Sequence, residues 1–185
     1  ATLSVISHWH PDHTGGAQVF DDAPILATAR TCELIAGEDP GDLDAYEAEI
    51  DAMLDQVRAL RETATTEAEI ERAENSLKVA GLLKEEAPGF RFTVPAPIDG
   101  DGMTFEGSDR TVEVVSYGLG HTESDLFAHI PDADLVILGD LLWVGHHPRV
   151  NDGDAIAWAL VLDRIDGLGA ASLIPGHGRL GARAD

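Results

Sequence analysis

The sequence predicts a mixed α/β fold, because two kinds of regular pattern run along the chain. Short β-prone or apolar runs, such as 111–115 and 135–138, lead into glycine-containing loops, as strands do at their ends. Other segments, such as 29–36 and 155–165, have the length and apolar content of short helices. The chain has 185 residues, of which 44% are hydrophobic, which is enough for one domain around a core. We therefore expect a single domain over residues 1–185.

The most informative segment lies near the start of the chain. Residues 8–13 read His-Trp-His-Pro-Asp-His and follow a β-prone stretch, which places them on a loop where a strand ends. If the backbone continues extended, the imidazoles of His8 and His10 point to the same side and can hold one ion. The proline after them breaks this geometry, so that Asp12 and His13 turn toward a neighbouring position. One loop can therefore serve two adjacent ions, and its donor groups suit zinc, iron or manganese.

Three further candidate ligands share one sequence pattern, in which a predicted strand is followed by glycine and then by the ligand. They are His121, Asp140 and His177. Such residues lie on loops held by a rigid scaffold, where chemistry is usually found. Together with the four residues of the first loop, they supply enough donors for two metal positions.

Four motifs in a fixed order carry a family resemblance. His-x-His-x-Asp-His, Gly-His-Thr, Gly-Asp and Pro-Gly-His-Gly, between residues 8 and 178, resemble the metallo-β-lactamase superfamily of metallohydrolases. The resemblance implies an αββα sandwich built from two similar halves. It also implies the ligands by matching positions: His8, His10 and His121 for the first metal, Asp12, His13 and His177 for the second, and Asp140 bridging both.

The resemblance also implies that the fold is N-terminally shortened. Members of the family have several strands before the first metal motif, whereas His8 comes almost at once in this sequence. We expect either a trimmed fragment or an unusually reduced member of the family.

The bridging aspartate narrows the branch of the family that the chain resembles. True β-lactamases usually carry cysteine or serine at the position of Asp140, whereas glyoxalase II-like, lactonase-like and phosphodiesterase-like members carry aspartate. This favours a hydrolase of a small ester, thioester or lactone, in which a hydroxide that bridges two divalent ions attacks the carbonyl. Asp12 would be the catalytic residue that orients the hydroxide and moves its proton. We expect zinc first, with iron or manganese as alternatives.

Three alternatives remain open at this point. An iron-dependent oxygenase, like the persulfide dioxygenases of the same superfamily, would use only His8, His10 and His121. The chain could also hydrolyse β-lactams, or it could be a non-catalytic metal-binding module.

Four residues beyond the ligands are predicted to line the substrate pocket. They are Trp143, His146, His147 and Tyr117. The first three follow Asp140 closely, and Tyr117 precedes the loop of His121. Asp152 and Asp154 are interpreted instead as turn and helix-cap residues.

A helical insertion is predicted over about residues 42–86. Apolar residues recur at helical spacing after Pro40 and Asp42, and a second helix begins at a capping box formed by Thr66 and Glu69. The insertion could be a lid or wall over the metal site, a dimerisation element, or a hairpin that simply packs on the domain.

Charge and hydropathy restrict the partners. The chain has 34 acidic and 12 basic residues and a net charge of −22, so its surface repels phosphate backbones and we expect no nucleic acid. No run approaches the ~20 apolar residues of a membrane span, and the start of the sequence lacks a basic secretion signal. We expect a small-molecule substrate, no membrane contact and a cytoplasmic location, with a homodimer left open.

Overall fold

A computed structural model describes residues 3–20, 22–37 and 43–183 of the chain. Two units can be separated, of which the larger comprises residues 1–38 and 92–185 and the smaller residues 39–91. Pro40 and Asp42, which were predicted near the start of the helical insertion, lie outside the described residues. The assignment of residues 1–185 to one domain stays a prediction.

The larger unit contains two sheets. The first is parallel and has the order β1 (Ser4–Val5), β2 (Ile25–Ala27) and β3 (Ala96–Pro97). The second has the order β4 (Gly102–Glu106), β5 (Thr111–Gly118), β6 (Asp125–Ile130), β7 (Leu135–Val144), β8 (Ser172–Gly178) and β9 (Gly181–Ala182). Within the second sheet β7 and β8 are parallel, and the other neighbouring pairs are antiparallel.

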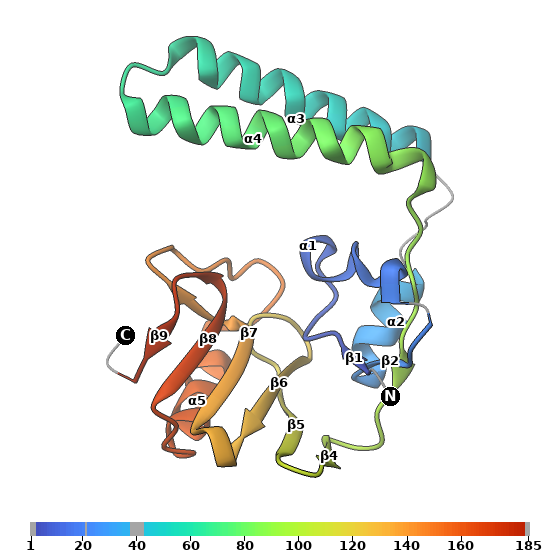
Figure 1. The fold of residues 1–185 in the computed structure, drawn as a ribbon, viewed down its shortest axis with the longest axis vertical. Helices are drawn as coiled ribbons and strands as arrows, with labels where there is room; N and C mark the ends of the chain where they lie inside the picture. Colours follow the sequence, from blue (N-terminus) through green and yellow to red (C-terminus); the bar gives the residue numbers. More distant parts are fainter. Residues whose placement is uncertain (1–2, 21, 38–42, 184–185) are drawn as a thin grey trace. The chain divides into compact units, whose positions relative to one another are not determined.

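The helices of the larger unit lie outside the sheets (Figure 1). They are α1 (Pro11–Thr14), α2 (Ala29–Gly37) and α5 (Ala155–Asp166), with single 3₁₀ turns at Ala17–Phe20 and Pro131–Ala133. Because α5 connects two parallel strands, it is the crossover that such a pair requires. Its N-cap is Asp154, whose side chain accepts hydrogen bonds from the amides of Ile156 and Ala157, which confirms the predicted cap.

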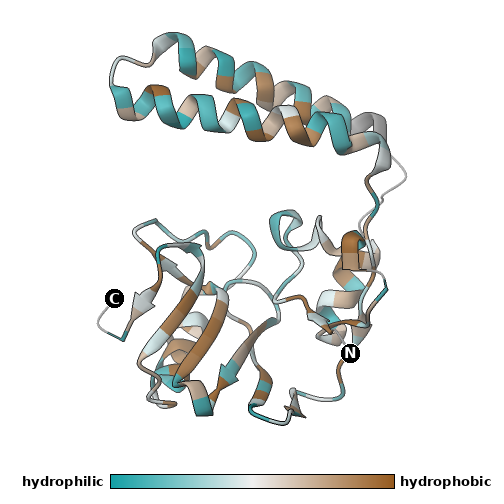
Figure 2. Ribbon diagram, viewed as in Figure 1, coloured by the Kyte–Doolittle hydropathy of each residue, from teal (hydrophilic) through white to brown (hydrophobic). Residues whose placement is uncertain are grey.

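Three apolar clusters hold these layers together. Ile35 of α2 packs against the first sheet, and Trp158, Val161 and Ile165 of α5 pack against the second. Between the two sheets, Leu26 of β2 contacts a cluster around Val114, Leu126 and Ile98. Much of β7 and part of β8 are correspondingly coloured as hydrophobic in Figure 2. The order helix, sheet, sheet, helix confirms the predicted αββα sandwich.

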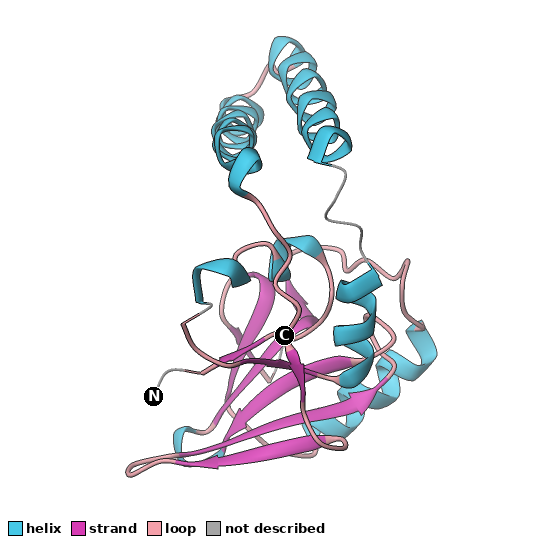
Figure 3. Cartoon of the chain, turned by 90° about the vertical axis from the view of Figure 1, so that its right-hand side faces the viewer, coloured by secondary structure: helices cyan, strands magenta, loops and turns pink. Residues whose placement is uncertain are grey.

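The smaller unit is an antiparallel helical hairpin (Figure 3). It consists of α3 (Leu43–Thr63), α4 (Glu67–Glu86) and a 3₁₀ turn at Ala87–Gly89. Thr66 accepts a hydrogen bond from the amide of Glu69, whose carboxylate accepts in return from the amide of Thr66, so the predicted capping box is confirmed. The buried seam contains Ile50, Leu54 and Ala80. None of the helices in the described part of the chain combines the length and the apolarity that crossing a bilayer requires.

Candidate metal centre

The structure brings the seven residues that were predicted as ligands into two adjoining groups. Within each group, every residue offers one donor atom within 4.8 Å of the others. The first group is His8, His10, His121 and Asp140, and the second is Asp12, His13 and His177.

These residues come together because the segment after β1, the loop between β5 and β6, and strands β7 and β8 meet in the larger unit. The first two histidines lie shortly after β1, and the carbonyl of Ser7, just before His8, accepts a 2.7 Å hydrogen bond from the amide of Leu126 on β6. Asp12 and His13 lie in the first turn of α1, where Pro11 occupies the first helical position. His121 lies on the loop between β5 and β6, Asp140 on β7 and His177 on β8. Each sheet therefore contributes to both groups.

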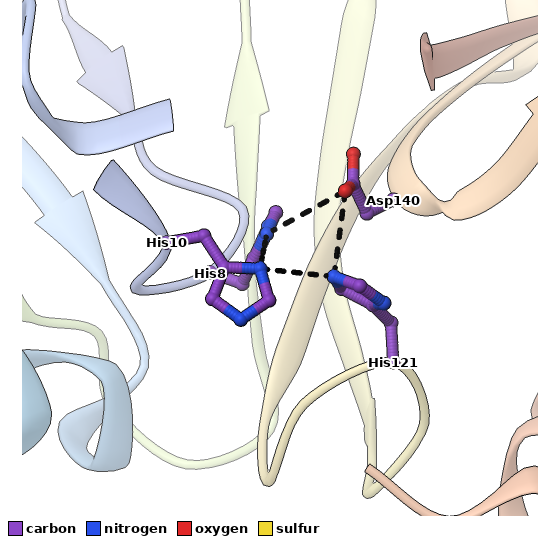
Figure 4. Close-up of side chains that lie close together, drawn as sticks. All are labelled: His8, His10, His121 and Asp140. Atoms are coloured by element: carbon purple, nitrogen blue, oxygen red, sulfur yellow. Dashed lines mark hydrogen bonds and ion pairs between the residues drawn. The ribbon is translucent and has the colours of Figure 1, made fainter. Parts of the chain in front are cut away.

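The donor atoms of the first group point toward one another (Figure 4). Nδ1 of His10 lies 3.0 Å from Nε2 of His8 and 3.1 Å from Nε2 of His121. Oδ2 of Asp140 lies 3.4 Å from Nε2 of His121 and 3.9 Å from Nε2 of His8. Four donors about 2.0–2.1 Å from a tetrahedral ion would lie about 3.3–3.4 Å from one another. The observed separations therefore suit a single ion.

The second group has similar spacing and shares Asp140 with the first. Nε2 of His177 lies 3.1 Å from Oδ2 of Asp12 and 3.4 Å from Nε2 of His13. The other aspartate, Asp140, places Oδ1 3.1 Å from Nε2 of His13 and Oδ2 3.5 Å from Nε2 of His177. The carboxylate of Asp140 therefore faces both groups, as the predicted bridging role requires.

Asp140 provides the test of whether these residues fit a metal. Its side chain is 3% exposed, and within the described residues Oδ1 is a buried oxygen that no donor meets with hydrogen-bond geometry. Unpaired buried carboxylate oxygens are unfavourable. An ideal Cβ at Gly176 would lie 2.0 Å from Oδ1, so only glycine leaves room for this carboxylate. A buried carboxylate with one orphaned oxygen and imidazole nitrogens 3.1–3.9 Å from its two oxygens fits a divalent cation.

The protonation of His8, His121 and Asp140 also suits metal binding, whereas His13 would have to release its proton to bind an ion. Burial lowers the pKa of His8 to about 2, and burial likewise lowers the pKa of His121, so both imidazoles are neutral. Burial alone would raise the pKa of Asp140, but the close approach and charge of His13 lower it below its usual value. For His13 burial lowers the pKa, and the contacts with Asp140 and Asp12 outweigh this and raise it. Neutral imidazoles and an ionised carboxylate are the forms that bind metals.

The three histidines of the first group each have a polar partner on the nitrogen that faces away from the centre. Nδ1 of His8 lies 3.0 Å from the hydroxyl of Ser7, and Nδ1 of His121 donates to the carbonyl of Arg149 at 2.9 Å. Nε2 of His10 donates to Oδ2 of Asp152 at 3.1 Å. Such partners fix the tautomer and the orientation of a ligating imidazole.

Two of the acidic residues at the site were not predicted from sequence. Asp152, interpreted as a turn residue, is the partner of His10. Asp125 is buried and accepts hydrogen bonds from the amide and the hydroxyl of Thr122, which follows His121. Burial raises the pKa of Asp125 to about 6. Asp125 thus holds the loop that presents His121, and no motif in the sequence signals this.

Of the four predicted substrate residues, one lines the pocket that contains the donor groups. Trp143 lines a pocket over the donor groups, and its ring stacks on His177 with centroids 4.3 Å apart. His146 and His147 are exposed and are not among the residues that line this pocket. Its lining includes Arg149, Asn151 and Asp152, which follow β7, and Trp9 and Pro11, which follow β1.

Tyr117 lies at a different pocket. Its ring packs edge-on against Phe127, and the guanidinium of Arg164 lies 3.6 Å from the ring centroid. This pocket is lined by Asp101, Ser116 and Arg164 and does not include the donor groups. Tyr117 points this way because it lies two positions after Val115 on β5, on the same face, and both side chains pack on the cluster that includes α5. The structure therefore does not bring Tyr117 to the candidate metal centre.

Comparison with known proteins agrees with this architecture. The fold is an αββα sandwich that carries the donor groups at one edge. A family model described as metallo-beta-lactamase superfamily matches residues 5–177, and the chain belongs to this superfamily. The resemblance inferred from the motifs is therefore confirmed. A comparison with curated proteins gives no match.

Solved structures show the same fold at low sequence identity. A metallo-beta-lactamase from Pontibacter korlensis is 19% identical with a TM-score of 0.64, and the match covers 100% of this chain and 65% of that protein. DIM-1 metallo-beta-lactamase exposed to ceftazidime is 19% identical with a TM-score of 0.55, covering 98% and 62%. TMB-1 is 18% identical with a TM-score of 0.58, covering 97% and 61%. The chain thus spans less than two thirds of the length of these proteins.

Proposed function

We propose that the chain is a dinuclear metal-dependent hydrolase that cleaves a small ester, thioester or lactone. The observation that carries the proposal is the position of Asp140, whose two oxygens face two separate groups of donors. Membership of a superfamily that consists mostly of metal-dependent hydrolases supports it. The aspartate at this position favours an ester, thioester or lactone over a β-lactam.

The residues that would hold the ions follow from the two groups. His8, His10 and His121 would bind one ion, and Asp12, His13 and His177 the other, with Asp140 between them. We propose zinc, with iron or manganese as alternatives, because all three accept nitrogen and oxygen donors. Two such ions, when bound, would supply an activated water and polarise the carbonyl that is attacked.

Asp12 is proposed as the catalytic residue. Its carboxylate is 57% exposed and lines the pocket, whereas Asp140 is buried. Oδ2 of Asp12 can therefore accept a proton from the attacking water and pass it to the leaving group. Asp140 also lines the pocket, but its side chain is only 3% exposed, so it would act in holding the metals.

The pocket wall supports a small-molecule substrate. Trp9 and Trp143 provide apolar surface beside the donor groups, and Arg149 and Asn151 provide polar groups. Ligand sites commonly combine mostly apolar walls with a few polar groups that orient the ligand.

The test is a substrate panel with defined metal loading. The 185-residue chain would be freed of metal, loaded with two equivalents of zinc and assayed against esters, thioesters, lactones and a β-lactam. We expect hydrolysis of a member of the first three classes, and loss of hydrolysis together with metal in Asp140→Asn. An inactive two-zinc protein across the panel would contradict the proposal. One iron per chain with oxygen uptake would replace it with the oxygenase alternative.

A further inference from the structure

We propose that Trp143 is the positioning residue of the second donor group, and that its indole sets the affinity for the ion held by Asp12, His13 and His177. This inference rests on the metal centre of the proposed function, but it does not depend on which bond is cleaved.

The backbone places Trp143 beside His177. The two residues are register partners in the parallel pair of β7 and β8. The next partners are Val144 and Gly178, where an ideal Cβ on the glycine would lie 1.9 Å from the carbonyl oxygen of Val144. The two backbones therefore approach closely just beyond the ring pair, which holds the register. The rings are 28° from parallel with centroids 4.3 Å apart, so the indole covers one face of the imidazole.

The other end of the indole is fixed as well. Its Nε1–H donates a 2.9 Å hydrogen bond to the backbone carbonyl of Asp140, three positions earlier on β7. The ring of Trp143 therefore connects Asp140 with His177. The hydrogen bond and the stacking contact both involve candidate ligands; the indole also packs against the core cluster that includes α5, and its ring centroid lies 6.2 Å from that of His121.

His177 needs this contact more than the other histidines do. Its side chain is 36% exposed, whereas those of His8 and His121 are 1% exposed. Each histidine of the first group is oriented by a polar partner on its outer nitrogen. For His177 the contact among residues 3–20, 22–37 and 43–183 that can restrict rotation from outside the donor group is the face of Trp143. An exposed imidazole without this restraint would lose more rotational freedom on binding an ion.

The stacking therefore predicts a selective effect. Removing the indole should lower the affinity for the second ion and leave the affinity for the first ion nearly unchanged. Outer partners of metal ligands typically change affinity by about 10–100-fold. A tryptophan that only formed a wall of the pocket would alter substrate KM without altering metal affinity.

The experiment measures zinc binding to the metal-free full chain by chelator competition, in the absence of substrate. Trp143→Ala and Trp143→Leu should raise the second dissociation constant by about 10-fold or more. Trp143→Phe retains an aromatic face and should restore affinity to within about threefold of wild type. The first dissociation constant is the internal control and should change by less than about twofold. If the alanine variant does not fold, the leucine and phenylalanine variants make the same comparison.

Three results would overturn the inference. They are an unchanged second dissociation constant in Trp143→Leu, an equal loss for both ions, and a loss in Trp143→Phe as large as that in Trp143→Leu. Failure of the hydrolase proposal is seen separately, because a two-zinc wild-type protein that cleaves no substrate can still show the selective effect of Trp143.

Discussion

Removal of the carboxylate of Asp152 tests whether the loop after β7 controls the first metal group. Asp152→Ala deletes the acceptor that lies 3.1 Å from Nε2 of His10, 142 positions away in sequence. Without it, the imidazole of His10 loses the contact that orients Nδ1 toward His8 and His121. We expect weaker binding of the first ion and little change in the second.

The magnitude follows from the exposure of the pair. Loss of an outer partner typically lowers metal affinity by about 10–100-fold. The side chain of Asp152 is 44% exposed, so solvent screens its electrostatic attraction to His10. The effect should therefore be at the lower end of the range of about 10–100-fold. We therefore expect the dissociation constant of the first ion to rise about tenfold, which corresponds to about 1.4 kcal/mol of binding free energy. Asp152→Asn keeps an acceptor oxygen and should lose less.

Asp154 provides a matched control two residues away. Its carboxylate caps α5 through the amides of Ile156 and Ala157. Asp154→Ala should lower the free energy of unfolding by about 0.5–2 kcal/mol, with zinc affinity unchanged. Chelator competition measures the affinities, and urea unfolding of the metal-free proteins measures stability. Equal zinc affinity in Asp152→Ala and wild type, or an equal loss in both alanine variants, would refute the reasoning.

Three other predictions, one of them with a control variant, give independent outcomes. Gly176→Ala places a methyl group about 2.0 Å from Oδ1 of Asp140, so we expect metal analysis to find fewer than two ions per chain; a full complement would show that the carboxylate can move. Asp12→Ala should lower kcat by about 10²–10⁴-fold in a zinc-loaded protein, whereas His129→Ala, which removes a cross-strand pair with Glu113, should leave kcat near wild type. Asp125→Ala leaves buried donors of the His121 loop unpaired and should lower the free energy of unfolding by about 1–3 kcal/mol in urea titration, and an unchanged midpoint would argue against that role.

The sequence predicted those features whose signals are local. The ligand motifs each lie within a few residues of a strand end, and the resemblance supplied their grouping. The capping box at Thr66 and Glu69 and the cap at Asp154 are also short-range patterns, and the structure confirms both.

The unpredicted features depend on contacts between distant parts of the chain. Asp152 reads as a turn residue until the loop after β7 is placed against His10. Tyr117 was predicted near the metals because it precedes His121 by four positions. The alternation of β5 instead turns its ring toward α5, and a register irregularity between Ser116 and Gly118 separates it from the loop that follows. Sequence proximity does not determine which face of a sheet a side chain occupies.

The irregular register between β7 and β8 has a consequence for how the protein folds. Gly139 pairs with Pro175 and Trp143 with His177, so β7 advances four residues while β8 advances two. The two additional residues of β7 place the side chain of Asp140 against Gly176. This requires the two strands to pair across the connection that contains α5. Pairings of such long sequence separation form slowly. We therefore expect refolding to proceed at the same rate with and without zinc, because both donor groups are complete only when β7 and β8 have paired.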